Sequence, residues 1–432
     1  MWIGVDDTDS STEMCTTYIG IRIAAMASNM IIGYPRLVRL NPNIPYKTRG
    51  NGAICFHLGE EGNKRIKVGH YAGKDIYSNG EEHPLHSSEE IKKTVISIVE
   101  ELYVHGEPNT NPGIVFLKER PNPEFYLRCL REDVPIDDAK AAIDKIGGEY
   151  VQINIGRGII GAAASIAWEP GLHTFELICY RGSIHVNLSR AEKLEAAKLC
   201  DAYDGTFNNM DLENNTPSIF PRERTPVLFG IRATNPEILL TIFNDLQIRF
   251  NQIPEDFLIY ETNQGTDDHI RAGNGFRIDG AGIAVEGRIM GRPRRMRGGH
   301  LTGELASGND TITFLVFEPS KKFRNVFENL NEGDKIRLLG SVSRGNVKVE
   351  KLEILSLSHI YRRIPPVCDV CHVKGTNRGS GNYLCSECGK ILLPEYEKVT
   401  RNIKEGRFQP PVSARRHLSM PWEISGTMEE VK

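Results

Sequence analysis

Four cysteines near the end of this chain restrict what that region can fold into. Cys368, Cys371, Cys385 and Cys388 are spaced C-x2-C-x13-C-x2-C. Two pairs of this kind can present four thiolates tetrahedrally to one Zn2+, and a short segment with little apolar core needs such a metal to fold. We therefore predict a zinc ribbon. The basic, proline-containing stretch 401–417 after it is expected to be a loosely ordered arm that either contacts phosphates or packs on the core.

The rest of the composition is that of a globular protein. Charged residues make up 25% and hydrophobic residues 40% of the 432 residues. No apolar run approaches the ~18 residues of a membrane span, and acidic residues stand where a signal peptide would be basic and apolar. We expect a cytoplasmic protein without a membrane partner. The five scattered cysteines are interpreted as buried small apolar residues: Cys15, Cys55, Cys129, Cys179 and Cys200.

Three acidic residues follow a short apolar run at the N-terminus. Trp2 to Val5 is typical of a buried strand, and Asp6, Asp7 and Asp9 come at its carboxyl end, where open α/β sheets bind their ligands. Carboxylate oxygens are ligands that Mg2+ prefers, and the phosphates of a nucleotide commonly complete its shell. The pattern fits a magnesium and nucleotide site, and it equally fits an Asx turn with helix caps.

A predicted helix over 18–26 begins close to the acidic cluster. Thr16 and Thr17 precede it, and a hydroxyl at the start of a helix suits either capping or contact with a phosphate.

A glycine-containing loop lies between two further predicted strands, 37–40 and 53–58. Lys47 and Arg49 could close over phosphates, while Gly50 and Gly52 would let backbone N–H groups approach the anion. An ordinary glycine hairpin would explain the same residues.

The middle of the chain alternates strand and helix periods, as an α+β sandwich would. The predicted elements are 174–180, 191–203, 227–233, 236–246 and 257–261. Gly156-Arg157-Gly158 opens a weak match to a dinucleotide-binding fingerprint, although close helix packing explains the small residues better. The polar segment 262–269 either recognises a small cationic ligand or builds a turn.

The segment 283–354 has the pattern of an OB-fold, in which five short strands surround one helix. The assigned strands are 283–289, 311–317, 335–342 and 347–354, and the helix is 323–330. From residue 281 onward 25 Lys and Arg stand against 17 Asp and Glu, in a chain of net charge −3. An OB-fold beside a zinc ribbon in a basic region favours nucleic-acid binding. The first loop carries candidate RNA-binding residues, which could also form a merely solvated loop: Arg292, Arg294, Arg295 and Arg297.

Taken together, these motifs resemble the archaeal tRNA-Ile agmatinylcytidine synthetase family. The matching segments are 4–9, 14–18, 41–52, 156–158 and 262–264, and the order of OB-fold and zinc ribbon also fits. The resemblance implies a multidomain α+β protein. Its expected parts are a kinase-like α/β catalytic domain that binds ATP (1–172), a ferredoxin-like agmatine-binding domain whose segments can interleave with the first (173–280), an OB-fold β-barrel (281–358) and a C-terminal zinc ribbon with an arm (359–432).

The resemblance also implies a reaction. The family uses ATP to phosphorylate the C2 oxygen of the wobble cytidine in an isoleucine tRNA with a CAU anticodon, and the primary amine of agmatine then displaces the phosphate. ATP is consumed to AMP, and the product 2-agmatinylcytidine allows AUA to be decoded. The implied cofactors are ATP, Mg2+ and Zn2+, and no obligate protein partner is inferred.

Individual roles follow from the same resemblance. Thr16 corresponds to a threonine that becomes autophosphorylated, with Thr17 as the adjacent alternative. Asp6, Asp7 and Asp9 match the acidic cluster around nucleotide and metal, with Asp6 and Asp7 as the Mg2+ ligands. Lys47 and Arg49 would offset phosphate charge, and Asp267 and Asp268 are candidates for the agmatine guanidinium. The chain departs from the family at Glu13, where the family has glycine.

Two other interpretations stay open. One is a binding protein for single-stranded nucleic acid that uses the OB-fold and zinc ribbon without catalysis. The other is a metal-dependent phosphoesterase, which generally needs further His or Asp ligands. The available histidines show no convincing metal spacing: His57, His70, His83 and His86. Dependence on ATP would exclude the first, and dependence on the amine the second.

Overall fold

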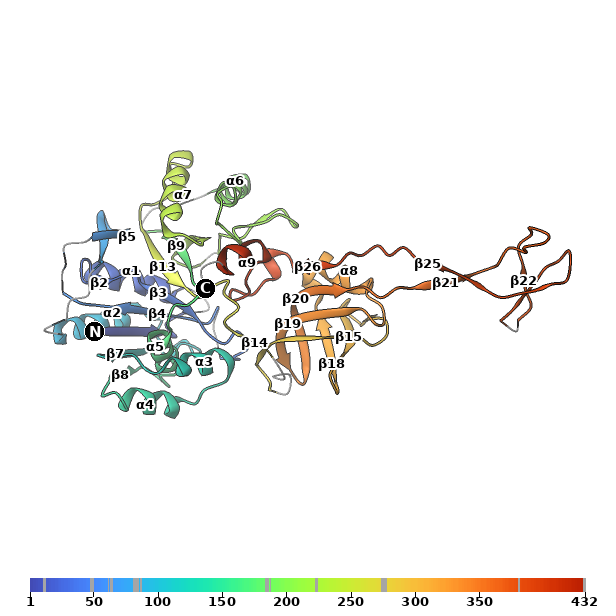
Figure 1. The fold of residues 1–432 in the computed structure, drawn as a ribbon. Helices are drawn as coiled ribbons and strands as arrows, with labels where there is room; N and C mark the ends of the chain where they lie inside the picture. The colour runs from blue at the N-terminus through green and yellow to red at the C-terminus, as the bar shows by residue number, and fades with distance from the viewer. Residues whose placement is uncertain are drawn as a thin grey trace.

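A computed structural model describes the chain apart from short stretches. It leaves out 11–12, 47–49, 61, 63–64, 81–84, 86–87, 183–185, 187, 222–223, 273–277, 380 and 430–432. The described residues form a mixed α+β fold with an eleven-stranded sheet, a closed five-stranded barrel and a cysteine-rich segment on a two-stranded stalk (Figure 1). Among them, no helix combines the length and apolar character needed to cross a membrane.

The large sheet is organised around β1 (Trp2–Asp6), where the N-terminal apolar run predicted a strand. β1 pairs antiparallel with β4 (Gly52–His57) and β7 (Gly113–Leu117). The rule that open α/β sheets bind ligands at the carboxyl ends of their strands therefore does not apply to the acidic residues after β1, because that rule concerns parallel strands. The carboxyl end of β1 lies instead beside the starts of β4 and β7. The other strands along the sheet are β2 (Ile31–Ile32), β3 (Arg36–Arg39), β5 (Arg65–Tyr71), β6 (Lys74–Asn79), β8 (Glu149–Gln152) and β13 (Phe257–Thr262).

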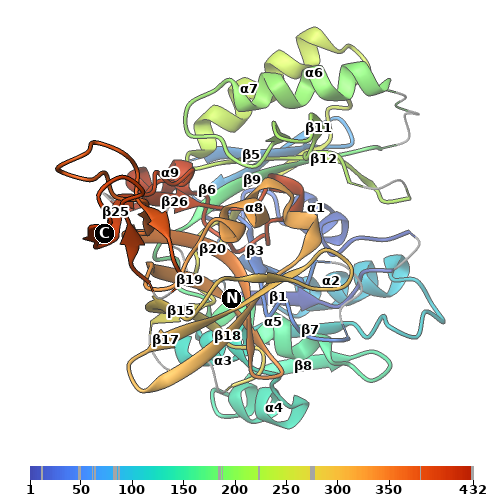
Figure 2. The same cartoon turned by 90° about the vertical axis from the view of Figure 1, so that its right-hand side faces the viewer.

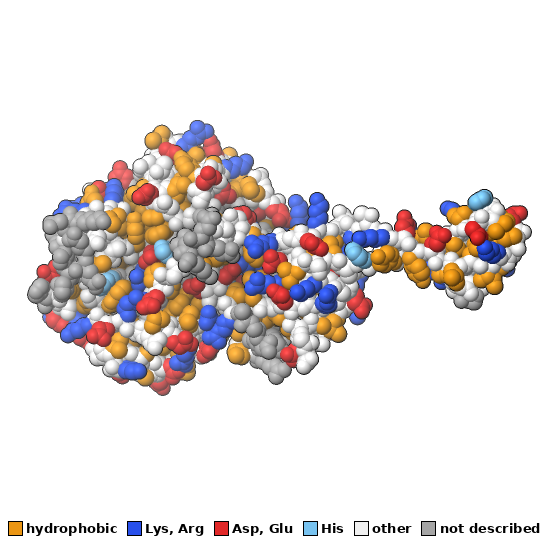
Figure 3. Space-filling model, viewed as in Figure 1, with side chains coloured by type: hydrophobic (Ala, Val, Ile, Leu, Met, Phe, Trp, Pro, Cys, Tyr) orange, Lys and Arg blue, Asp and Glu red, His pale blue; other side chains and the backbone are white. Residues whose placement is uncertain are grey.

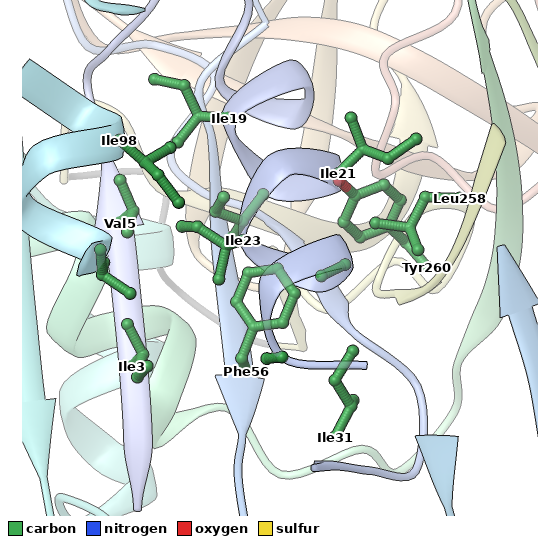
Figure 4. Close-up of a cluster of buried hydrophobic side chains, with 14 of the residues drawn as sticks. Ile3, Val5, Ile19, Ile21, Ile23, Ile31, Phe56, Ile98, Leu258 and Tyr260 are labelled. Atoms are coloured by element: carbon green, nitrogen blue, oxygen red, sulfur yellow. The ribbon is translucent and has the colours of Figure 1, made fainter. Parts of the chain in front are cut away.

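Different helices cover the two faces of this sheet. Ile3 and Val5 of β1 join a core with α1 (Thr16–Met26) and α2 (Glu89–Leu102), and Figure 4 shows them beside Ile19 and Ile23 of α1. The opposite face packs on α3 (Pro123–Arg131), α4 (Ile136–Asp144) and α5 (Gly158–Ala167). Nearly every residue of α5 is buried, which confirms helix packing as the reason for its small residues.

Beyond β13 the sheet continues into β9 (Thr174–Tyr180) and β12 (Val227–Ala233). The helices α6 (Arg190–Asp201) and α7 (Pro236–Arg249) cover these strands (Figure 2). The predicted alternation of strands and helices in this region is confirmed. A small ladder of β10 (Met210–Asp211) and β11 (Thr216–Pro217) accompanies it.

The barrel closes because each of its five strands pairs with the next and the last pairs with the first. In spatial order they are β15 (Gly282–Ile289), β17 (Leu301–Ser307), β18 (Asp310–Val316), β20 (Asn346–Ser356) and β19 (Lys335–Ser343). The helix α8 (Lys322–Glu328) precedes β19, as predicted. The strand without an assigned range was β17, where Gly303 and polar residues weaken the strand signal. Short strands flank the barrel, β14 (Ile270–Ala272) and β16 (Arg294–Arg295).

The cysteine-rich segment projects from the barrel on the ladder of β21 (Tyr361–Ile364) and β25 (Glu395–Lys398) (Figure 1). Its own strands are β22 (Thr376–Asn377), β23 (Tyr383–Leu384) and β24 (Ile391–Leu392). The chain then returns to the barrel as β26 (Gly406–Phe408), which pairs with β20, and its last described element is α9 (Trp422–Glu429).

The expectation of a loosely ordered arm over 401–417 is wrong. Arg401 forms an ion pair of 2.6 Å with Asp334, whose side chain is fully buried. Farther along, Leu418 is 2% exposed and belongs to the core between the large sheet and α5. Of the two possibilities left open for this stretch, packing on the core is observed, because a buried carboxylate and an apolar side chain hold it there.

Candidate active site

An open cleft of about 670 Å3 lies where β1, α1, α5 and the loop between β3 and β4 meet. Five residues predicted from the sequence line it: Asp6, Asp7, Asp9, Thr16 and Gly52. The structure therefore brings the acidic cluster, the first threonine and the glycine loop to one place, although they lie on separate elements.

The Asp6 side chain is held against α5. A Cβ atom at Gly161 would lie 1.8 Å from Asp6 Oδ2, so only glycine fits at this position of the helix. Burial raises the pKa of Asp6 well above its usual value, and the charge of Asp7 raises it further. Asp7 has a φ of 57°, a conformation that aspartate tolerates better than most residues. Burial, followed by the charge of Asp9, raises the pKa of Asp7 to about 7.

Like charges crowded in a buried place fit a cation. Among the described residues, the Asp6, Asp7 and Asp9 carboxylates do not converge on one point as the sulfurs of the cysteine segment do. They suit an ion held by one or two carboxylates and completed by phosphate oxygens, which is how Mg2+ commonly binds beside a nucleotide.

Asp9 is bonded to the start of α1. Its Oδ1 atom accepts the backbone N–H of Thr16 at 2.7 Å and also the Thr16 hydroxyl. The Thr8 hydroxyl donates to Thr16 Oγ1 at 3.0 Å. Asp9 thus accepts a backbone N–H in the first turn of α1 although Cys15 is the N-cap residue, and the same contacts direct the Thr16 hydroxyl at a carboxylate inside the cleft. In this arrangement Asp9 can take a proton from Thr16.

Thr17 is placed differently. Its hydroxyl lies 3.2 Å from Cys15 Sγ, and it does not line the cleft. Its backbone carbonyl accepts hydrogen bonds from two buried phenols, Tyr180 at 2.7 Å and Tyr260 at 2.8 Å. Figure 4 shows Tyr260 against α1 beside Ile21. Sequence reasoning missed these tyrosines, because both sit in apolar strand patterns that give no sign of a polar role.

The glycine loop is a hairpin between the antiparallel strands β3 and β4. Lys47 and Arg49 lie outside the described residues. Gly50 is held by Arg39, whose guanidinium donates to the Gly50 carbonyl at 2.7 Å. A second cation, Arg157, lines the cleft and stacks over Tyr46 at 4.3 Å. Its position in the weak fingerprint Gly156-Arg157-Gly158 was the signal that could have identified it.

Asp267 and Asp268 do not line this cleft. Asp267 accepts hydrogen bonds from Lys351 of the barrel and from the Met420 N–H at 2.8 Å. Asp268 accepts the Tyr126 hydroxyl at 2.9 Å, and burial raises its pKa.

Histidines do not complete a metal site at the acidic cluster. The His57 ring stacks on Trp2 at 3.9 Å, and burial lowers its pKa to about 4. His70 faces Asp256 instead, while His83 and His86 lie outside the described residues. A phosphoesterase with histidine ligands at this cleft therefore has no support in the described part of the chain.

The barrel exposes its predicted arginines, whereas the cysteine segment buries Cys368 and Cys385. All four arginines of the first barrel loop are exposed, and Arg295 pairs with Glu328 of α8. Figure 3 shows Lys and Arg side chains gathered over the barrel. The sulfurs of Cys368, Cys371, Cys385 and Cys388 all lie within 4.8 Å of one another. The sulfurs of Cys368 and Cys388 are 3.7 Å apart, close to the ~3.8 Å edge of a tetrahedron with Zn–S bonds of ~2.3 Å.

Comparisons with known proteins cover nearly the whole chain. Family models described as the TiaS TCKD domain and the TiaS FLD domain match residues 2–155 and 156–269. A protein of Thermoplasma volcanium, named as the isoleucine tRNA 2-agmatinylcytidine synthetase TiaS, is 37% identical over 430 residues, which are 98% of this chain and 97% of that protein. The protein of the same name from Methanocaldococcus jannaschii is 36% identical and is matched over 98% of each chain.

Solved structures agree in fold over the same extent. A complex of TiaS with its isoleucine tRNA and ATP is 30% identical with a TM-score of 0.80, covering 97% of this chain and 96% of that one. A complex of TiaS with the same tRNA, AMPCPP and agmatine is 29% identical with a TM-score of 0.76, at the same coverage of 97% and 96%.

Proposed function

The chain belongs to the TiaS family of isoleucine tRNA 2-agmatinylcytidine synthetases, and from that premise we propose how its own residues act. The protein is an ATP-dependent ligase that joins agmatine to the wobble cytidine of isoleucine tRNA, with tRNA, ATP and agmatine as substrates. A binding protein without catalysis is not favoured.

The observation that carries the assignment of roles is the hydroxyl of Thr16, which donates to Asp9 in the same cleft as Asp6 and Asp7. Thr16 is the phosphate acceptor. As its Oγ1 forms a bond to a phosphorus of ATP, the bond from that phosphorus to its bridging oxygen breaks and the rest of the nucleotide leaves, while the hydroxyl proton passes to the Asp9 carboxylate. Thr17 is disfavoured, because its hydroxyl faces Cys15 and its carbonyl is held by two tyrosines.

Asp6 and Asp7 would hold Mg2+, which offsets phosphate charge during transfer when it is bound. Burial first, and then repulsion between neighbouring carboxylates, raises the pKa of both groups, and a bound cation would offset that repulsion. Arg157 is the described cation in the cleft, and Lys47 and Arg49 stay predicted partners of the phosphates. Phosphorylating the cytidine C2 oxygen turns a poor leaving group into a good one for displacement by the agmatine amine.

The arginines of the first barrel loop and the cysteine segment would hold other parts of the tRNA. An OB-fold and a zinc ribbon are the finer descriptions that we propose for these parts, with kinase-like and ferredoxin-like domains before them. The four thiolates would hold Zn2+, and their spacing supports this.

The agmatine assignment stays a prediction. The structure does not rank the two candidates, because both carboxylates already accept hydrogen bonds, Asp267 from Lys351 and Met420 and Asp268 from Tyr126.

The test is mass analysis of the wobble nucleoside after incubating the protein with unmodified isoleucine tRNA, Mg-ATP and agmatine. A cytidine heavier by agmatine minus water, only in the complete mixture, supports the proposal. Omitting ATP or agmatine in turn, and replacing Thr16 by valine, should each abolish the product. An adduct without ATP, or no adduct despite tight tRNA binding, would refute it.

A further inference from the structure

Residues 406–420 lie between the barrel and the large sheet. β26 adds to the barrel strand β20. Nine and ten residues after its end, the carbonyl oxygens of His417 and Leu418 accept hydrogen bonds from the backbone N–H groups of Gly265 at 2.8 Å and Asp267 at 2.9 Å. Lys351 of β20 donates to the Met420 carbonyl at 3.1 Å. The segment 406–420, which we call the tail, therefore contacts both parts of the molecule.

Arg416 of the tail contacts both the barrel and the loop between β3 and β4. Its Nε lies 2.8 Å from Glu350 Oε1 on β20, and its Nη2 donates to Ser341 Oγ on β19 at 3.0 Å. The same Nη2 donates to Asn43 Oδ1 at 3.1 Å, across 373 residues of sequence. Glu350 is buried and also bonded to His269 at 2.9 Å, so the guanidinium is held by a fixed carboxylate.

Asn43 belongs to the hairpin that lines the nucleotide cleft. Its N–H donates to Asn41 Oδ1 at 2.9 Å, and its amide donates to the Gly280 carbonyl at 3.2 Å. The Asn41 carbonyl in turn accepts from Asn51 at 2.9 Å, which bridges the two sides of the hairpin. Ile44, Asn51 and Gly52 of this hairpin line the cleft. Asn43 is therefore the sequence neighbour of Ile44, which lines the cleft.

We propose that Arg416 is a positioning residue for the nucleotide cleft, which through Asn43 fixes residues 40–46 and 50–52 between β3 and β4, so that ATP use depends on the docked tail. The competing role for a basic residue in this tail is contact with a tRNA phosphate. The two differ in what they affect, because a phosphate contact changes tRNA affinity and its salt dependence, whereas a positioning contact changes nucleotide binding without tRNA.

The experiment compares Arg416→Lys, Asn43→Ala and their combination in the full-length protein. Calorimetry measures the affinity for AMPCPP in the absence of tRNA, and a titration in several salt concentrations measures tRNA binding. Arg407→Lys is the matched control, because Arg407 lies in the same tail and pairs with Glu353 of the barrel at 3.1 Å without touching the hairpin.

Each single variant should bind AMPCPP about five- to tenfold more weakly, which corresponds to losing one hydrogen bond of ordinary strength. The loss in the combined variant should fall short of the sum of the two single losses, since both remove the contact between Arg416 and Asn43. Each also removes a contact of its own, Asn43→Ala the bond to Gly280 and Arg416→Lys the bond to Ser341. The control and the salt slope for tRNA should be unchanged. If Arg416→Lys lowers the melting temperature, the AMPCPP affinity of Asn43→Ala decides the question, because this variant keeps the ion pair between Arg416 and Glu350.

Unchanged AMPCPP affinity in both single variants would overturn the proposal, as would effects that add. A loss confined to tRNA affinity with a smaller salt slope would assign Arg416 to a phosphate. The inference rests on the proposed use of the cleft for ATP. AMPCPP affinity tests the role of Arg416, and phosphorylation of Thr16 tests the proposed function. Protein that binds AMPCPP without phosphorylating Thr16 would refute the proposed acceptor and leave the test of Arg416 intact.

Discussion

Replacing Gly20 by alanine would place a methyl group in the contact that fixes the start of α1. A Cβ atom at Gly20 would lie 2.2 Å from Tyr260 Oη, 3.2 Å from Ile54 Cδ1 and 3.3 Å from Tyr260 Cζ. Because Tyr260 is fully buried, its hydroxyl must move and would lose the 2.8 Å bond to the Thr17 carbonyl.

The expected cost combines three effects. Overpacking a dense core costs about 1–3 kcal/mol, and a lost hydrogen bond about 0.5–1.5 kcal/mol. Alanine is favoured over glycine in a helix by about 1 kcal/mol, which offsets part of this. Gly20→Ala should therefore lower the free energy of unfolding by about 1–3 kcal/mol.

Tyr260→Phe tests whether the Tyr260 hydroxyl causes the loss of stability. Tyr260→Phe alone should cost about 1 kcal/mol for its hydrogen bond. In the combined variant the oxygen at 2.2 Å is gone, and the remaining contacts at 3.2 and 3.3 Å need only small shifts. Tyr260→Phe should thus rescue Gly20→Ala, and the combined loss should fall short of the sum by at least about 1 kcal/mol.

Urea unfolding followed by circular dichroism measures these differences. Tyr180→Phe is the matched control, because Tyr180 also donates to the Thr17 carbonyl but is not among the atoms that the new Cβ would meet. It should not rescue Gly20→Ala. Additive losses for Gly20→Ala with Tyr260→Phe, or equal rescue by both tyrosine variants, would refute the reasoning.

Other predictions concern the cleft and the cysteine segment. Thr16→Val should abolish labelling by γ-labelled ATP and Thr17→Val should retain most of it, whereas equal losses would contradict the assignment. Asp7→Asn should raise the melting temperature of the nucleotide-free protein at pH 8. The pKa of Asp7 is about 7 in the folded state against an ordinary 3.8, so the unmutated protein loses stability as the pH rises from about 4 to about 7 and does not regain it at pH 8. The gain should vanish near pH 4, and a melting curve at each pH checks this. Cys388→Ser, or a strong zinc chelator, should expose residues 361–398 to protease while leaving AMPCPP affinity unchanged, and a loss of that affinity would show that the segment supports the cleft.

The features predicted correctly are those that the sequence displays locally. The acidic residues after an apolar run, the threonines before a helix and the glycine loop between strands are each visible within a few positions. Their meeting in one cleft follows because all three lie at element ends on the same edge of the sheet. The pattern did not reveal that β1 has antiparallel neighbours, because a strand buried on both faces has an apolar run in either arrangement.

The missed residues act over long distances. Tyr260 reaches Thr17 across 243 residues and Arg416 reaches Asn43 across 373. Each stands in a pattern with a simpler explanation, an apolar strand for the tyrosine and a basic tail for the arginine. Spacing rules capture neighbours on one element, so they cannot identify a hydrogen bond that exists only after distant segments have packed.

Hydrogen bonds between residues far apart in the sequence help to hold the cleft together. The segment that carries Asp9 and Thr16 is held partly by its own hydrogen bonds and partly by distant ones, since the Thr17 carbonyl accepts hydrogen bonds from β9 and β13. Arg416 of the tail contacts the loop between β3 and β4 in the same way. On the proposed use of the cleft, a nucleotide bound there would also stabilise contacts between parts that lie far apart in the sequence, and those contacts would raise its affinity in turn. Residues that never touch ATP can thus change its binding without altering any acidic side chain.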